Sequence, residues 1–157
     1  MKDTPVVDDN NLIAERLESL KAGIFGGLSV CLTFLITTFL NNLLLAKYFT
    51  ALSILQLNIQ DWRWWISAVI SCFCGLLFGV TYRYIIRSDE NPQLKAGGVL
   101  AFGLVRGLTQ IDVGLCCYST ILPFVVLGTE SVVWFAMSAI ALNTAIKLGW
   151  IKPFKST

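Results

Sequence analysis

Long apolar runs separated by short charged segments form the main pattern along the chain. Three of these runs contain no charged residue, at 22–46, 64–82 and 131–146. A helix needs roughly 20 apolar residues to cross about 30 Å of hydrocarbon. The third run reaches this length at Ile151 if the amine of Lys147 extends to the membrane interface. The pattern therefore predicts three membrane-spanning helices.

The stretch 92–128 is also mostly apolar, but Arg106 and Asp112 interrupt it. It fits one long, tilted helix, or an interfacial helix to about Ile111 followed by a short span over 113–128. A turn at 112–114 would instead produce two crossings here and five in total. Hydrophobic periodicity does not separate these three interpretations.

The distribution of Lys and Arg favours four crossings. Nine of the twelve Lys and Arg residues then lie on one side of the membrane, in the N-terminal arm, the 83–95 segment and the C-terminal tail. Cytoplasmic loops carry the excess of these residues, whereas five crossings would place the lysines of the tail outside. We therefore predict an all-α polytopic membrane protein with a 1–21 arm, a 22–151 membrane domain and a 152–157 tail. Its four helices are expected at about 22–46, 64–86, 96–128 and 131–151.

The composition agrees with a chain that is solvated by lipid. Hydrophobic residues make up 55% of the chain, the mean hydropathy is +0.69, and charged residues make up only 14%. Soluble domains contain about 25% charged residues, so too few polar side chains remain to cover a water-facing surface. The net charge of +2 is too small and too scattered to indicate nucleic acid as a partner.

The 1–21 arm is expected to contain a short amphipathic helix. Asp9 or Asn10 is a suitable N-cap, and the apolar residues that follow recur at helical spacing: Leu12, Ile13, Leu17 and Leu20. Two interpretations remain open, a helix that lies on the membrane surface and a docking helix for a soluble partner.

The loop 47–63 leads into the second span. Its alternating segment 55–60 suits either a strand edge or an interfacial helix. Asp61 is a candidate N-cap for the span. The tryptophans that follow are typical of the aromatic belt where a span meets water: Trp62, Trp64 and Trp65.

Small residues predict where helices approach each other closely, because helix association in lipid depends on such contacts. The second span has a stripe with a four-residue repeat, and two other spans have pairs at G-x-x-x-G spacing. These residues are Ser67, Ser71, Gly75 and Gly79, then Gly23 with Gly27, and Gly103 with Gly107. Packing within the four-helix unit is the expected role, and self-association into a homo-oligomer is the alternative.

Residues for catalysis or metal binding are scarce. The sequence has no histidine, which removes the commonest metal ligand and the commonest general base. The five cysteines lie in apolar runs and are expected to act as small hydrophobic side chains. Asp112 and Glu130 have no evident partner for acid–base chemistry. We therefore predict no catalytic residue, no metal site and no cofactor.

Arg106 is the strongest candidate for a functional side chain. A charge at mid-bilayer costs about 2.5–3.5 kcal/mol and normally faces protein or water. On a helix, Lys95, Arg106, Thr109 and Gln110 share one face, while Asp112 is about 120° from Arg106 and is not its intrahelical partner. These five residues are the candidate contacts for a partner or lipid. Arg106 is expected either to meet lipid phosphate from an interfacial helix, or to be a buried charge that binds a partner helix, a lipid head group or an anion.

The segments Tyr82–Arg87 (YRYIIR) and Asn91–Leu108 (NPQLKAGGVLAFGLVRGL) resemble a family of small multi-span membrane proteins of cyanobacteria and plant chloroplasts. The likeness is concentrated in residues 82–108, and the rest of the chain agrees only in hydropathy. It implies a thylakoid or other photosynthetic membrane, with both termini in the cytoplasm or stroma, and it transfers no catalytic residue. The plasma membrane is the alternative location.

Three classes of function remain. Small size and small-residue stripes favour a non-enzymatic accessory subunit, scaffold or assembly factor of a larger membrane complex, with membrane lipids and other membrane subunits as partners. A small transporter or channel with Arg106 in a polar intramembrane site is the alternative, although no inverted repeat links the two halves. An intramembrane enzyme would need a nucleophile and base that the sequence does not offer.

Overall fold

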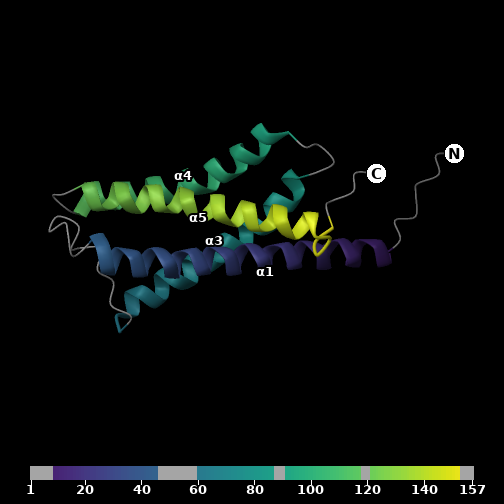
Figure 1. The fold of residues 1–157 in the computed structure, drawn as a ribbon, viewed down its shortest axis with the longest axis horizontal. Coiled ribbons are helices and arrows are strands. Elements are labelled where there is room, and N and C mark those ends of the chain that lie inside the picture. Colours follow the sequence, from purple (N-terminus) through teal and green to yellow (C-terminus); the bar gives the residue numbers. More distant parts are fainter. Residues whose placement is uncertain (1–8, 46–59, 87–90, 118–120, 153–157) are drawn as a thin grey trace.

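The computed structural model describes residues 9–45, 60–86, 91–117 and 121–152, and helices make up most of them. They are α1 (Asp9–Leu40), its π-helical continuation η1 (Asn41–Leu45), α3 (Trp62–Ile85), α4 (Pro92–Cys117) and α5 (Leu122–Lys147). Each of the four α-helices is long and apolar enough to cross a membrane. The prediction of an all-α polytopic membrane protein with four spans is confirmed (Figure 1).

The first span and the segment before it form one helix. α1 runs without interruption for 32 residues, so the residues 9–21 continue directly into the span (Figure 1). The prediction of a separate amphipathic helix on the membrane surface is therefore wrong. No proline or glycine precedes Gly23 in α1, and Glu, Arg, Leu and Ala are good helix formers. At 1.5 Å per residue the helix is about 48 Å long, which exceeds the hydrocarbon thickness.

The predicted boundary between the third and fourth spans is also wrong. α4 continues through Asp112 and Gly114 and ends at Cys117, and α5 begins at Leu122. The division expected between 128 and 131 does not occur, nor does a break at 111–114. Pro123 lies in the first turn of α5, where its fixed φ and missing N–H are favourable. This proline was the sequence signal for the true start.

A glycine ends α5 earlier than the expected 151. Gly149 has a φ of +75°, in the left-handed region that glycine adopts just past helix ends. The chain turns back there, and the amide of Trp150 donates a 2.9 Å hydrogen bond to a carbonyl of α5. Ile151 is fully buried, and the rings of Trp150 and Phe25 lie 6.0 Å apart between centroids. The start of the C-terminal tail is thus held against α1.

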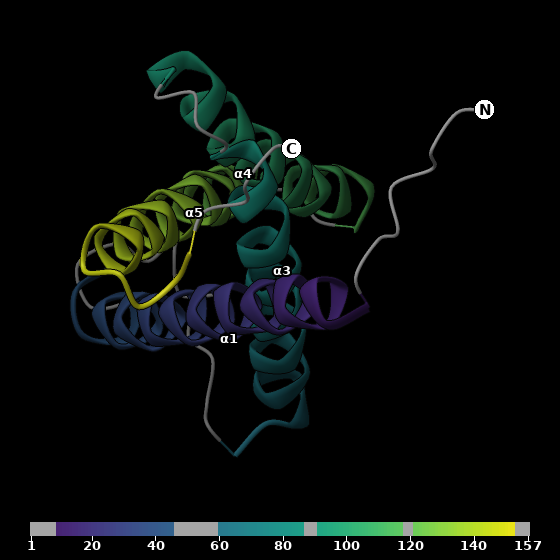
Figure 2. The same cartoon turned by 90° about the vertical axis from the view of Figure 1, so that its right-hand side faces the viewer.

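The helices form two closely packed antiparallel pairs, α1 with α3 and α4 with α5, and α5 also packs along α1. Figure 2 shows α3 crossing α1 steeply, and Figure 1 shows the first half of α4 diverging from α5. The core between α1, α3 and α5 is rich in aromatic rings, among them Phe34, Phe78, Trp134 and Phe135. By contrast, α3 and α4 contact each other only sparsely.

Small residues lie at both close contacts. A Cβ on Gly79 would lie 2.2 Å from the carbonyl oxygen of Ala22, and one on Gly107 would lie 2.8 Å from that of Gly128. Neither pair of backbones would tolerate a side chain here without moving apart. The neighbouring helix lies within van der Waals reach of Gly23, Gly27, Gly75, Gly79, Gly103 and Gly107, and also of Gly26 and Gly128, which were not predicted.

The start of α3 differs partly from the expected aromatic belt. Asp61 occupies the N-cap position but its side chain makes no capping hydrogen bond. Trp62 and Trp65 are exposed, whereas Trp64 is buried against Phe34 with ring centroids 5.8 Å apart. Trp64 therefore belongs to the core, because its ring packs against Phe34 of α1. The alternating segment predicted at 55–60 lies outside the described residues except for Gln60.

Candidate functional site

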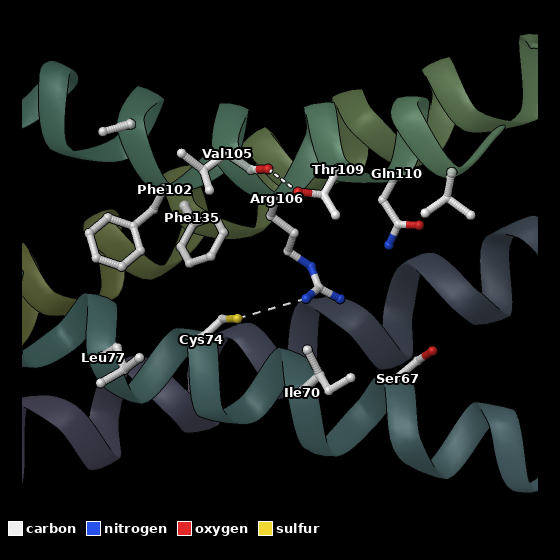
Figure 3. Close-up of a pocket in the computed structure, with 12 residues that line it drawn as sticks. Ser67, Ile70, Cys74, Leu77, Phe102, Val105, Arg106, Thr109, Gln110 and Phe135 are labelled. Atoms are coloured by element: carbon white, nitrogen blue, oxygen red, sulfur yellow. Dashed lines mark hydrogen bonds between the residues drawn. The ribbon is translucent and has the colours of Figure 1, made fainter. Parts of the chain in front are cut away.

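A pocket of about 620 Å³ lies between α3 and α4, where these helices contact each other sparsely (Figure 3). Side chains of three helices line it. They are Ser67, Ile70, Cys74 and Leu77 of α3, Ala101, Phe102, Val105, Arg106, Thr109, Gln110 and Val113 of α4, and Phe135 of α5.

The lining is polar toward one end and apolar toward the other. Figure 3 shows Ser67 and Gln110 near one end, and Leu77 and Phe102 near the opposite end, with Arg106 between them. The polar end corresponds to the first turns of α3 and the last turns of α4. The lining is therefore mostly apolar, and its polar side chains gather toward one end, beside Ile70 and Val113.

The pocket opens sideways, at the depth of the lipid. Val105 and Ile70 line it from the middle parts of α4 and α3, and their side chains are 70% and 48% exposed. Exposed apolar residues at mid-helix in a membrane protein face the acyl chains. A molecule that reaches the pocket through this opening comes from the bilayer.

Arg106 extends from α4 across the pocket toward α3. One Nη donates a 2.8 Å hydrogen bond to the Ser71 hydroxyl, and the other lies 3.8 Å from the Cys74 sulfur. The guanidinium carbon is 5.1 Å from the ring centroid of Trp134, a cation–π contact worth up to about 2 kcal/mol away from water. Ser71 donates in turn to the carbonyl of Ser67 at 2.6 Å.

These contacts leave Arg106 incompletely satisfied. A guanidinium has five N–H donors, and within the described residues only two nitrogens have a partner, one of them a weakly accepting sulfur. Its Nε is buried without a hydrogen bond. Both ion pairs among the described residues lie elsewhere, at Arg83–Glu15 and Lys21–Glu18. No described carboxylate neutralises the charge of Arg106.

The aromatic side of the site is fixed by α1. The indole N–H of Trp134 donates a 3.1 Å hydrogen bond to the Thr37 hydroxyl, and its ring meets Phe34 edge-on at 5.4 Å between centroids. The close approach of α4 to α5 at Gly107 brings the neighbouring Arg106 over this ring. The position of the guanidinium is thus set by three helices.

The structure brings together only part of the predicted site. Arg106, Thr109 and Gln110 line the pocket, while Lys95 and Asp112 do not. Asp112 is exposed, because its direction on α4 differs from that of Arg106. The carboxyl of Glu130, predicted to have no evident mate, is hydrogen-bonded to the side chain of Asn41.

Sequence reasoning missed the groups that receive Arg106. Cys74 was expected to be a small hydrophobic side chain, and Ser71 a packing residue. Trp134 is one of many aromatic residues in apolar runs. Ser71 offered the best signal, since it is a hydroxyl in mid-span, but nothing local to it indicates a partner 35 residues away.

Another arginine, Arg83 near the end of α3, has no exposed side-chain surface. It forms an ion pair with Glu15, and it donates to the Glu15 carbonyl at 2.9 Å, to the Ser19 hydroxyl and to the Lys152 carbonyl at 3.0 Å. The backbone amide of Lys152 also donates to the Glu18 carboxylate at 3.1 Å. We call Arg83, Glu15, Ser19 and the Lys152 carbonyl the α3 latch, since together they join α1, α3 and the C-terminal tail.

Within the described residues, no three His, Cys, Asp or Glu side chains lie close enough to hold a metal ion. Comparison of the chain with protein-family models, with curated protein sequences and with solved structures found no match. A functional assignment therefore rests on the chemistry of the pocket between α3 and α4.

Proposed function

We propose that this protein is a non-enzymatic accessory subunit, scaffold or assembly factor of a larger membrane complex. The observation that carries the proposal is Arg106, a cation in a laterally open pocket that forms no ion pair with any described residue. An intramembrane charge is costly, and such residues mark functional contacts. Because the pocket opens toward the acyl chains, its partner comes from within the membrane.

The unequal burial of the spans supports a partner on the α4 side. The most apolar window of α4 buries 17% of its residues within the unit, whereas that of α5 buries 39%. Apolar exposure alone does not drive helix association in lipid, and polar side chains supply much of the specificity. Arg106 is the cation that α4 presents to the pocket at mid-span.

Two features of the sequence support a location. The likeness of residues 82–108 to membrane proteins of cyanobacteria and chloroplasts favours a photosynthetic membrane complex in the thylakoid, with the plasma membrane as the alternative. The excess of Lys and Arg in the arm, the 83–95 segment and the tail favours termini in the cytoplasm or stroma.

The test is co-migration in native gels. The membranes are solubilised in a mild detergent, and the wild-type chain is expected to migrate with an assembly far larger than its own 17.4 kDa. Arg106→Gln should release it at unchanged abundance, and Arg16→Gln, a change at an exposed arginine of α1, should not. Migration of the wild-type chain by itself would contradict the proposal.

The pocket also keeps transport as a second candidate, because a transporter of anions needs a cationic cavity within the membrane. Purified protein in liposomes would then conduct anions, and Arg106→Gln would abolish the flux. Equal flux in protein-free vesicles and in vesicles with the wild-type chain would exclude this candidate.

A further inference from the structure

We propose that the pocket between α3 and α4 binds an anionic membrane lipid, with the headgroup at Arg106 and one acyl chain along the apolar end. This rests on the proposed function in one respect, since both take the pocket as the functional site. The bound lipid is then the contact between this pocket and the larger membrane complex.

The headgroup is identified by the donors that Arg106 keeps available. Its charge has no described counterion, and most of its N–H groups have no described acceptor. A planar guanidinium binds phosphate oxygens through two parallel hydrogen bonds. Ser67, Thr109 and Gln110 line the same part of the pocket. The Thr109 hydroxyl already donates a 2.8 Å hydrogen bond to the Val105 carbonyl, which leaves the Ser67 hydroxyl and the Gln110 amide to donate to glycerol ester oxygens. A headgroup with net negative charge is favoured over a zwitterionic one, because no described carboxylate is present to pair with an attached cation.

The acyl chain is identified by the other end of the pocket. Leu77, Phe102 and Phe135 form an apolar lining that continues from the polar groups (Figure 3). The volume of about 620 Å³ lies within the roughly 300–1,000 Å³ of pockets that enclose small ligands. Polar head and apolar chain therefore meet matching surfaces in one continuous cavity.

The orientation of the pocket matches that of a lipid in a leaflet. Ser67 and Ser71 follow Trp62, the first residue of α3, by five and nine positions, which are rises of about 7.5 and about 13.5 Å along the helix. Ser71 accepts the hydrogen bond from Arg106, so the guanidinium lies near the deeper of these two levels. Trp62 and Trp65 are exposed at this end, and exposed tryptophans lie at the headgroup level. A lipid of the adjacent leaflet thus enters head-outward, with its phosphate drawn well below the headgroup level to reach Arg106.

A carboxylate on a partner helix fits less of the site. It would neutralise the charge of Arg106. A helix is about 10 Å across, however, so the backbone of the partner helix would remain outside the pocket. The apolar end at Leu77 and Phe102 would stay unfilled. An acyl chain is thin and flexible enough to occupy this end, which makes the lipid the better occupant.

The test uses purified full-length protein in detergent and native mass spectrometry. Dioleoyl phosphatidylglycerol and dioleoyl phosphatidylcholine have the same chains and differ in headgroup charge. We expect the wild-type protein to bind the phosphatidylglycerol about tenfold more tightly. Both headgroups offer a phosphate, but only phosphatidylcholine brings a second cation next to Arg106. Arg106→Gln should bring the ratio close to one, and Arg106→Lys should retain part of it, since lysine lacks the guanidinium fork.

Four controls test the specificity of the result. Arg63→Gln removes an exposed cation near the tryptophans and should leave the preference unchanged. Val105→Trp narrows the opening and should weaken the binding of both lipids. Circular dichroism establishes that each variant keeps its helix content. Inorganic phosphate at millimolar concentration should not compete, because it lacks the chain.

Several outcomes would overturn the proposal that the pocket binds a lipid. Equal affinity for the two lipids in the wild-type protein would do so, as would a preference that survives Arg106→Gln. Competition by inorganic phosphate would make the site one for free anions. Co-migration with a complex that depends on Arg106 in a protein that binds neither lipid would assign the site to a protein carboxylate. That last result would leave the proposed function standing, whereas lipid binding by a chain that migrates alone would refute only the proposed function.

Discussion

Near the end of α3, the guanidinium of Arg83 donates to α1 and to the C-terminal tail, whereas in the middle of α4 that of Arg106 meets one hydroxyl, one sulfur and an indole ring. Arg83 has a carboxylate partner in Glu15, and its side chain has no exposed surface. Arg106 has no described carboxylate partner, and it lines an open pocket.

The difference follows from how closely α3 approaches its two neighbours. Gly75 and Gly79 let α1 pack against α3 with backbones in contact, and this brings Glu15 and Ser19 to Arg83. On its other side α3 meets α4 only sparsely, so Arg106 reaches across a gap. Hydrogen bonds to charged groups contribute about 1.5–3 kcal/mol each, so the closed contact is a stabilising site and the open one retains binding capacity.

The largest expected effect tests the closed side. Arg83→Gln removes the cation from the α3 latch and leaves the carboxylate of Glu15 without its partner. Breaking a buried pair in this way costs about 3–5 kcal/mol, and we expect the lower end because the Glu15 side chain is 38% exposed. The measurement is the free energy of unfolding in detergent micelles, with Arg16→Gln as the matched control. Unchanged stability of the Arg83 variant would remove the basis of the comparison.

A second prediction compares two glycines in the same way. A Cβ at Gly79 would lie 2.2 Å from the backbone oxygen of Ala22, whereas one at Gly97 on α4 would meet nothing within 4 Å. Gly79→Ala should therefore destabilise the fold by about 1–3 kcal/mol through overpacking. Gly97→Ala should be neutral or stabilising by up to about 1 kcal/mol, because alanine favours a helix. Equal losses at the two sites would mean that α4 is enclosed as tightly as α1 and α3.

The smallest expected change in stability is that of Arg106→Gln. It loses the hydrogen bond to Ser71 and the contact with Trp134, but it also removes a charge that costs about 2.5–3.5 kcal/mol within the membrane. These terms oppose each other, and we expect a change within about 1 kcal/mol in either direction in the same unfolding assay. A loss as large as that of Arg83→Gln would show that Arg106 is a structural residue like Arg83.

Element ends were less predictable than the spans themselves. The third span was expected to continue to 128, yet α4 stops at Cys117 and α5 begins at Leu122, with Pro123 in its first turn. The apolar character of 113–128 hid this boundary, because lipid-facing residues and residues at helix ends are equally apolar. Gly149 similarly ends α5 within a stretch that hydropathy alone assigned to the span.

The sequence alone predicted the cation of the candidate site and the polar residues that share its helix face. Arg106, Thr109 and Gln110 could be grouped because residues three and four apart share a helix face, which is a local property. Lys95 satisfied the same angular criterion but lies outside the pocket, since α4 diverges from its neighbours over its first half. The angular position of a residue on its helix does not determine how far that residue lies from the neighbouring helix.

The number of spans and their helical state depended on the sequence alone, because a backbone in lipid must satisfy its hydrogen bonds within each apolar run. The placement of nine cations on one predicted side is likewise a property of sequence order. Only the tertiary structure decided which arginine has a carboxylate partner and acceptors for its N–H groups. Glu15 lies 68 positions from Arg83 and Ser71 lies 35 positions from Arg106, and such partners are set by glycine contacts and helix crossing. Those depend on the packing of whole helices, which no local pattern contains.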